Sequence, residues 1–189
     1  KKCDIDTKEL LTPIEEYPSF NAFFSRKLKP SSRPICTDPD CFVAPADGRY
    51  RFFPDITSIQ QIDVKNKTFS LRDLIKNDPL TEKYSNGGMI SIRLAPADYH
   101  RFHFPCACIP ALSEIINGYL FSVNPIATKN SLSLLTENKR SLSLLKTDFF
   151  GDILFIEIGA TNVGSINQTF LPNKKYDKGE EKGYFSIGG

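Results

Sequence analysis

The sequence predicts a mainly β protein of the α+β class, with a sandwich-like or barrel-like core and a few helices. From Phe42 onward, short stretches rich in β-branched and aromatic residues alternate with turn residues, which is typical of a sandwich or barrel. The 189 residues are enough for one domain, or for a domain with an N-terminal arm. The hydrophobic fraction of 40% and the charged fraction of 24% suit a soluble globular protein.

Residues 1–41 are predicted to form an N-terminal arm with an amphipathic helix. Ser19 is a suitable N-cap, and Lys29-Pro30 is expected to end the helix. Helical spacing is shared by Phe20, Phe23, Phe24 and Leu28, and basic residues follow this aromatic face at Arg26, Lys27, Lys29 and Arg33. Two interpretations stay open: a helix packed on the core with a solvated basic end, or a contact with an anionic membrane surface.

Residues 42–189 are predicted to form a β-rich domain. Strands are expected near 42–44, 49–53, 58–64, 88–94, 99–104, 111–117, 119–123, 141–148, 152–158, 163–169 and 183–187. A helix is expected over 71–77, with Ser70 as its N-cap and Asp78-Pro79 after it, and a short helix near 129–135.

Both histidines lie in the stretch Asp98-Tyr-His-Arg-Phe-His-Phe-Pro105. Its aromatic residues and alternation predict a strand, in which residues three apart face opposite sides. The apolar side would hold His100, Phe102 and Phe104, and the polar side Tyr99, Arg101 and His103. His100 is then either a core histidine with satisfied ring nitrogens or a general acid or base oriented by a carboxylate. A bulge in this strand would remove the distinction between the two histidines.

Two turn-like stretches and one strand end carry the other candidates. Asp47, in Pro45-Ala-Asp-Gly48, is either a turn former or an active-site carboxylate. The small residues of 159–166 form a tight turn or allow a ligand to approach the backbone closely. Gly188-Gly189 follow a predicted strand and allow three interpretations: an arbitrary boundary of the sequence, a natural terminus or a processing site.

Cysteine content and hydropathy argue against several classes of protein. The five cysteines contain no Cys-x-x-Cys pair, and the chain has only two histidines, so no metal site is predicted. The cysteines are predicted to be free thiols in a reducing compartment. The net charge of +2 does not indicate nucleic-acid binding. No apolar run approaches the ~18 residues of a membrane span, and no signal peptide is evident. Because the chain begins with Lys1, removal of an N-terminal anchor stays an open alternative.

Together and in this order, these stretches resemble the phosphatidylserine decarboxylase family, over nearly the whole chain from about Tyr17. The resemblance rests on Phe-x-x-Phe-Phe-x-Arg-x-Leu-Lys-Pro-x-x-Arg-Pro at 20–34, Pro45-Ala-Asp-Gly48, Asp98-Tyr-His-Arg-x-His-x-Pro105, Ser122-Val-Asn-Pro125, Asn138-Lys-Arg140, Gly159-Ala-Thr-Asn-Val-Gly-Ser-Ile166 and Lys178-Gly-Glu-Glu-x-Gly-Tyr-Phe185. It implies a proenzyme that cuts itself between a glycine and a serine. Gly189 would end the larger β subunit, and the serine would become a pyruvoyl group at the N-terminus of a small α subunit outside this chain.

The resemblance also implies roles for individual residues. His100 would be the base that activates the serine, oriented by Asp47. The serine oxygen would attack the Gly189 carbonyl, and elimination and hydrolysis would then give the pyruvoyl group and ammonia. A Schiff base between this group and phosphatidylserine would lose CO2 to give phosphatidylethanolamine, with His100 as proton donor and His103 as the second candidate. Substrate contacts are predicted for Phe102, Asn162 and Ser165.

Partners and surroundings follow from the same resemblance. Strands of the α subunit would complete the β-sandwich-like core, with helices packed on one side, and two αβ units could form a homodimer. The enzyme would be a peripheral membrane protein, on the cytoplasmic side of the inner membrane if bacterial, with the 20–33 segment docking on the lipid surface. Two alternatives are a pyruvoyl-dependent decarboxylase of a soluble amino acid and a noncatalytic lipid-binding β domain.

Overall fold

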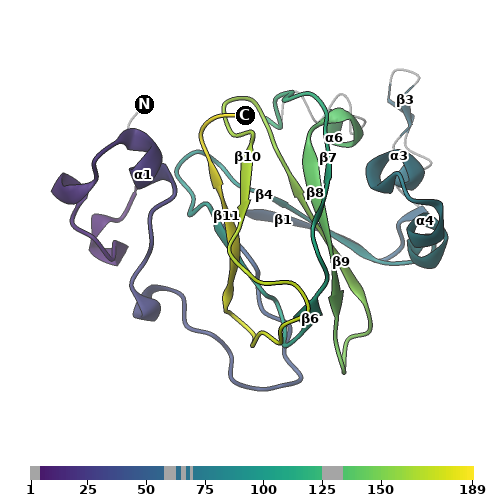
Figure 1. Cartoon of the computed structure of the whole chain (residues 1–189), viewed down its shortest axis with the longest axis horizontal. Helices are drawn as coiled ribbons and strands as arrows, with labels where there is room; N and C mark the ends of the chain where they lie inside the picture. Colours follow the sequence, from purple (N-terminus) through teal and green to yellow (C-terminus); the bar gives the residue numbers. More distant parts are fainter. Residues whose placement is uncertain (1–4, 58–62, 65–66, 69, 125–133) are drawn as a thin grey trace.

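The computed structural model describes residues 5–57, 63–64, 67–68, 70–124 and 134–189. Strands predominate, and a few short helices lie beside them (Figure 1). The elements are η1 Thr7–Glu9, η2 Ile14–Glu16, α1 Phe20–Phe24, η3 Pro30–Ser32, β1 Arg49–Phe53, β2 Asp63–Val64, β3 Lys67–Thr68, α3 Leu71–Ile75, α4 Asp78–Tyr84, β4 Met89–Arg93, β5 Arg101–His103, β6 Ile109–Pro110, β7 Glu114–Ile116, α6 Leu134–Glu137, β8 Arg140–Lys146, β9 Ile153–Ile158, β10 Ser165–Gln168 and β11 Glu181–Ser186.

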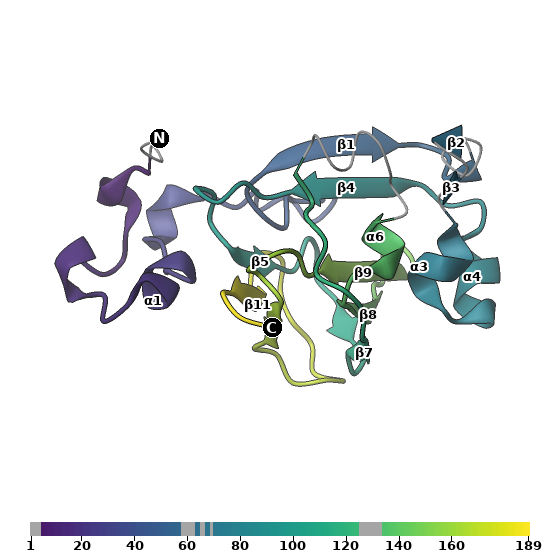
Figure 2. The same cartoon turned by 90° about the horizontal axis from the view of Figure 1, so that it is seen from above.

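The antiparallel sheet of β6, β7, β8 and β9 is the central layer of the fold. One of its faces packs on α3 and on the β1–β4 pair through Leu142, Leu154, Ile156 and Ile158. The other face packs on the sheet of β10, β11 and β5 through Leu145, Ile153 and Phe155. Figure 2 shows β1 and β4 side by side along one side of the molecule, above β5, β9 and β11. This layered, mainly β arrangement confirms the predicted fold class.

A buried ion pair joins the two sheets. The Lys182 ammonium group on β11 donates to Glu157 Oε1 at 2.5 Å, to Ser143 Oγ at 2.9 Å and to Gln168 Oε1 at 2.9 Å. The exposed fractions of the Lys182 and Glu157 side chains are 0% and 1%. Burial lowers the pKa of Lys182, and the charge of Glu157 opposes that shift. Loss of one partner would leave an uncompensated charge in the core, at a cost of about 3–5 kcal/mol. The pair therefore ties β11 in one sheet to β9 in the other.

The helix beside the central sheet begins as predicted but is followed by a helix that the sequence analysis missed. Ser70 Oγ accepts the amide of Asp73 and caps α3, which confirms the predicted N-cap. Asp78-Pro79 does not simply end the helix, because α4 begins at Asp78 with Asn77 as its N-cap. Proline is compatible with the first turn of a helix, where its missing N–H is not needed.

Most predicted strands correspond to an observed strand within a few residues, and two do not. The stretch 42–44 is irregular and contributes single backbone bonds such as Val43 N–H to Pro105 O at 2.9 Å. The stretch 119–123 makes only an isolated bridge between Tyr119 and Asn138. Part of the predicted strand 58–64 and most of the predicted helix 129–135 lie outside the described residues, and their described parts are in β2 and α6.

The N-terminal segment lies beside the sheets and extends to one side in both views (Figures 1 and 2). Ser19 caps α1 as predicted, but the helix ends at Phe24 and not near Lys29. Of the basic residues, Lys27, Lys29 and Arg33 are exposed, as a solvated basic end predicts, but Arg26 is only 4% exposed. Arg33 also binds two carboxylates. Within the described ranges, every helix falls short of the length and apolar character that a membrane span requires.

Candidate active site

The two histidines lie at β5, between the N-terminal segment and β11. β5 pairs with β11 antiparallel, with His103 opposite Glu181 and Arg101 opposite Tyr184. Phe102 and Phe104 point into the core, whereas Tyr99 stacks on His103 with ring centroids 5.8 Å apart. The alternation predicted for 99–104 is therefore present, and it sends the two histidines into different surroundings.

His100 lies under the first helix of the chain. Its ring is 5% exposed and faces Phe24 of α1 at a centroid distance of 3.9 Å. Because the carbonyl of Asp98 can only accept, the 2.8 Å contact fixes the proton on Nδ1 and leaves the lone pair on Nε2. Burial lowers the pKa of His100 to about 4. His100 is therefore neutral near pH 7, with Nε2 able to take up a proton.

The pKa of His100 should respond to loss of the Phe24 ring. We expect the His100 imidazole signal in an NMR titration of the intact protein to titrate near pH 4, and near its ordinary value of 6.5 in Phe24→Ala, where water reaches the ring. Phe20→Ala, on the same helix but 71% exposed, is the matched control and should leave the pKa unchanged. Titration of the unsubstituted protein near 6.5 would contradict the burial argument.

The same pKa shift makes folding sensitive to acid. Between pH 6.5 and about 4 the unfolded chain binds a proton at His100 that the folded chain does not. The free energy of unfolding therefore falls by up to roughly 3 kcal/mol as the pH drops through this window.

His103 has a more polar environment. Its Nδ1 donates to Gly179 O at 2.9 Å, and its Nε2 lies 3.3 Å from Tyr99 Oη. Burial lowers the pKa of His103, while the charges of Glu181 and Asp47 act to raise it. Arg101 forms a bidentate ion pair with Glu181, with both N–O distances at 2.9 Å. The carboxylates of Glu181 and Asp47 thus act on His103, whereas the Asp98 carboxylate acts to raise the pKa of His100.

The predicted pairing of Asp47 with His100 is not what the structure contains. The Asp47 carboxylate accepts from Arg33 at 2.9 and 2.7 Å, and Arg33 also binds Glu9. The reason lies in the backbone: the His103 amide donates to Pro45 O, so the segment that carries Asp47 runs antiparallel to β5. Side chains opposite one another in such a pair share a face, which puts Asp47 with Arg101 and His103.

Phe102 is buried in the core between the sheets. Its ring is 2% exposed and packs between Phe155 and Phe185, with centroid distances of 6.1 and 5.2 Å. These contacts give Phe102 a packing role, and its contact with substrate stays a prediction.

The turn at 159–166 makes hydrogen bonds with the residue that follows β11 and Ile187. The amides and carbonyls of Ala160 and Val163 bond reciprocally, and Asn162 adopts a left-handed conformation with φ of 68°. Gly164 N–H donates to Gly188 O at 2.6 Å, and Gly188 N–H donates to Asn162 O at 3.2 Å. A Cβ at Gly164 would lie 2.9 Å from Gly189 Cα, so only glycine permits this approach. Ser165 follows directly and pairs with Ser186 of β11.

Comparison with known proteins assigns the chain to a family. A family model described as phosphatidylserine decarboxylase matches residues 20–189. The chain belongs to the phosphatidylserine decarboxylase family. Relatives named phosphatidylserine decarboxylase proenzyme are 50% identical over 185 residues in Chlamydia pneumoniae, 51% over 189 residues in Chlamydia caviae and 48% over 189 residues in Chlamydia felis. These alignments cover 98%, 100% and 100% of this chain, which spans 62%, 63% and 63% of the length of those relatives.

In this decarboxylase-family chain, the 20–34 motif contacts the candidate site directly. Phe24 covers His100, and Arg33 binds Asp47. The Arg26 guanidinium donates to the carbonyls of Ala97 and Asp98 at 2.7 and 3.1 Å. Sequence reasoning treated this motif only as a helix or a lipid-facing element. Its regularly spaced aromatic and basic residues were the signal, but nothing local indicated that Phe24 and Arg26 meet residues more than seventy positions away.

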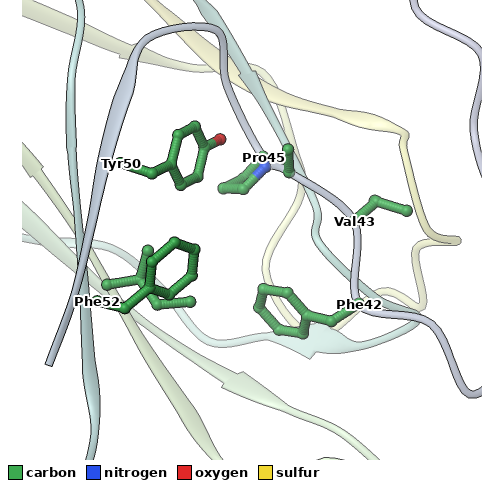
Figure 3. A pocket seen from close by; sticks show the side chains of 7 residues that line it. Phe42, Val43, Pro45, Tyr50 and Phe52 are labelled. Carbon is green, nitrogen blue, oxygen red and sulfur yellow. The ribbon is translucent and has the colours of Figure 1, made fainter. Parts of the chain in front are cut away.

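An apolar pocket of about 310 Å³ lies between residues 42–45 and the β1–β4 pair (Figure 3). Its lining consists of Phe42, Val43, Ala44, Pro45, Tyr50, Phe52 and Ile90. The Tyr50 hydroxyl donates to Ala46 O at 2.5 Å. Because no charged side chain lines this pocket, it has no group to recognise a charged headgroup, and the candidate chemistry of this family member stays with the histidines.

Proposed function

We propose that the protein containing this chain decarboxylates phosphatidylserine to phosphatidylethanolamine after cutting itself behind Gly189, and that this chain supplies the β-subunit part. The observation that carries the proposal is membership of the phosphatidylserine decarboxylase family over residues 20–189. The name proenzyme, shared by the relatives, supports a processing step. The partner is then an α subunit from the same precursor, with a pyruvoyl group at its N-terminus.

The residues of this chain suit such a group in two respects. Gly164 and Gly189 approach each other closely beside the Leu120 side chain, so the residue before the proposed cut is held in a confined position. His100 and His103 both turn Nδ1 to a backbone carbonyl, which leaves Nε2 for proton transfer. When bound, a pyruvoyl group supplies a carbonyl that draws electrons from the bond that breaks as CO2 leaves.

For self-cleavage we assign the base to His103 and its charge partner to Asp47. This assignment applies triad logic to the histidine that shares a face with a carboxylate. Nε2 of His103 takes the proton of the attacking hydroxyl, and the Asp47 and Glu181 charges favour the resulting imidazolium. Arg33 holds Asp47 in place through two hydrogen bonds.

For decarboxylation we assign proton transfer to His100. Its neutral Nε2 accepts the proton that the substrate ammonium must lose and can return it to the carbon from which CO2 departs. The returned proton becomes the hydrogen that replaces the carboxylate on that carbon. Burial under Phe24 excludes water that would compete for this proton.

The function is tested on the full-length precursor. Intact mass spectrometry should find two chains, the smaller with a blocked N-terminus, and CO2 should be released from liposomes that contain phosphatidylserine. Release of CO2 from free amino acids without release from liposomes would indicate the soluble-substrate alternative. An uncut chain that binds liposomes without CO2 release would indicate the noncatalytic alternative.

A further inference from the structure

The side chain of Asn21 in α1 binds the backbone at the end of β11. Ile187 N–H donates to Asn21 Oδ1 at 2.9 Å, and Asn21 Nδ2 donates to Ile187 O at 3.2 Å. A carboxamide carries the same donor and acceptor pair as a peptide group. Asn21 therefore acts on Ile187 as a neighbouring strand would.

This contact continues the hydrogen-bond ladder of β11 where β5 no longer supplies a partner. The Phe185 amide donates to His100 O, the last such bond on the β5 side. Since alternate residues of a strand direct their N–H and C=O groups to the same side, Ile187 is the next rung on that side. Asn21 occupies this rung, while Gly188 is held on the opposite side by Asn162 and Gly164.

The helix that presents Asn21 is itself anchored beside the candidate site. Ser19 Oγ caps it by accepting the amide of Ala22. Arg101 Nε donates to the carbonyls of Ser25 and Arg26 just after the helix, at 3.0 and 3.2 Å. With Phe24 packed on His100, the Arg101 bonds hold the C-terminal end of α1 against β5 and the residue before it. Asn21 is thus presented to Ile187 from a fixed support.

We propose that Asn21 is a positioning residue for self-processing, which holds the strand end so that the Gly189 carbonyl meets the attacking hydroxyl. This inference rests on the proposed function. Glycines have unusual backbone freedom, and Gly188 adopts a φ of 126°, so the carbonyl is located only as well as the residues before it. Displacement of a reacting group by about 1 Å can cost about 100-fold in rate.

The test compares full-length precursors that carry Asn21→Ala, Asn21→Asp or Phe20→Ala. Phe20 is the adjacent exposed residue and serves as the matched control for cleavage and thermal stability, which are measured without lipid. Cleavage is followed by intact mass spectrometry, and CO2 release from phosphatidylserine liposomes is measured per cut molecule. We expect cleavage to slow by about 10-fold to 100-fold in Asn21→Ala. We expect an intermediate rate in Asn21→Asp, which keeps the bond to Ile187 N–H only, and a normal rate in Phe20→Ala.

A positioning role predicts that cleavage and catalysis separate. The Asn21→Ala molecules that have been cut should decarboxylate at the normal rate, and the uncut precursor should keep its thermal unfolding midpoint within a few degrees of that of Phe20→Ala. Normal cleavage in Asn21→Ala would overturn the inference, as would equal losses of cleavage, catalysis and thermal stability, which indicate general unfolding. A wild-type precursor that does not cut would instead overturn the proposed function, and this inference with it.

Discussion

Replacement of His103 by glutamine is expected to slow self-cleavage of the full-length precursor strongly. Glutamine can still donate to Gly179 O, the bond that His103 makes at 2.9 Å, but it has no basic nitrogen. Loss of a general base typically costs about 10²–10⁴-fold in rate. Cleavage should therefore fall by that factor, as measured by the fraction of cut chain over time in intact mass spectrometry.

Asp47→Asn provides the companion measurement for His103. It keeps the size of the side chain and removes the charge that acts to raise the pKa of His103. We expect slower cleavage than in wild type and faster cleavage than in His103→Gln. Normal cleavage in His103→Gln together with a block in His100→Gln would restore the pairing of Asp47 with His100 that the sequence alone suggested.

Replacement of His100 by glutamine is expected to impair decarboxylation and to leave self-cleavage nearly unchanged, the reverse of the effect expected for His103→Gln. The precursor should be cut at a near-normal rate, because the Asp47 and His103 groups are retained. Decarboxylation per cut molecule should fall by about 10²–10⁴-fold, because the buried nitrogen that moves the proton is gone. The measurement is CO2 release from phosphatidylserine liposomes, normalised to the cut fraction.

Folding of the His100 variant is checked by its thermal unfolding midpoint. Glutamine can retain the bond to Asp98 O but does not reproduce the ring contact with Phe24. Leu112→Ala, at a residue that is 76% exposed, serves as the surface control. Undiminished CO2 release in His100→Gln would remove His100 from the decarboxylation step.

Local patterns in the sequence were enough to predict most strands and the caps of two helices. Ser19 and Ser70 were predictable because a cap depends only on residues within the first turn. The alternating serines and leucines of β8 predicted a strand, but not that Ser143 is buried to bind Lys182. α4 was missed because Pro79 was taken as a terminator instead of a first-turn residue.

The candidate site was only partly predictable, because its key contacts join distant segments. Asp47 was assigned to His100 on residue type and family resemblance. The backbone bond between His103 and Pro45, which decides the shared face, joins residues 58 positions apart in sequence. The cover of Phe24 over His100 and the contact of Asn21 with Ile187 likewise depend on how the arm folds back. Alternation within one strand cannot encode such pairings.

The buried Lys182–Glu157 pair bears on the order of folding and the proposed self-cleavage. Lys182 lies on the same strand that leads to Gly188 and Gly189, seven residues before the last of them. Removal of β11 from its sheet would leave the Glu157 charge without its partner in an apolar interior. β11 therefore stays paired in the sheet whether or not the chain continues after Gly189. Under the proposed function, folding would precede the cut, and the new carboxylate of Gly189 would stay beside Gly164. The proposed self-cleavage would then be an irreversible reaction within a chain that has already folded.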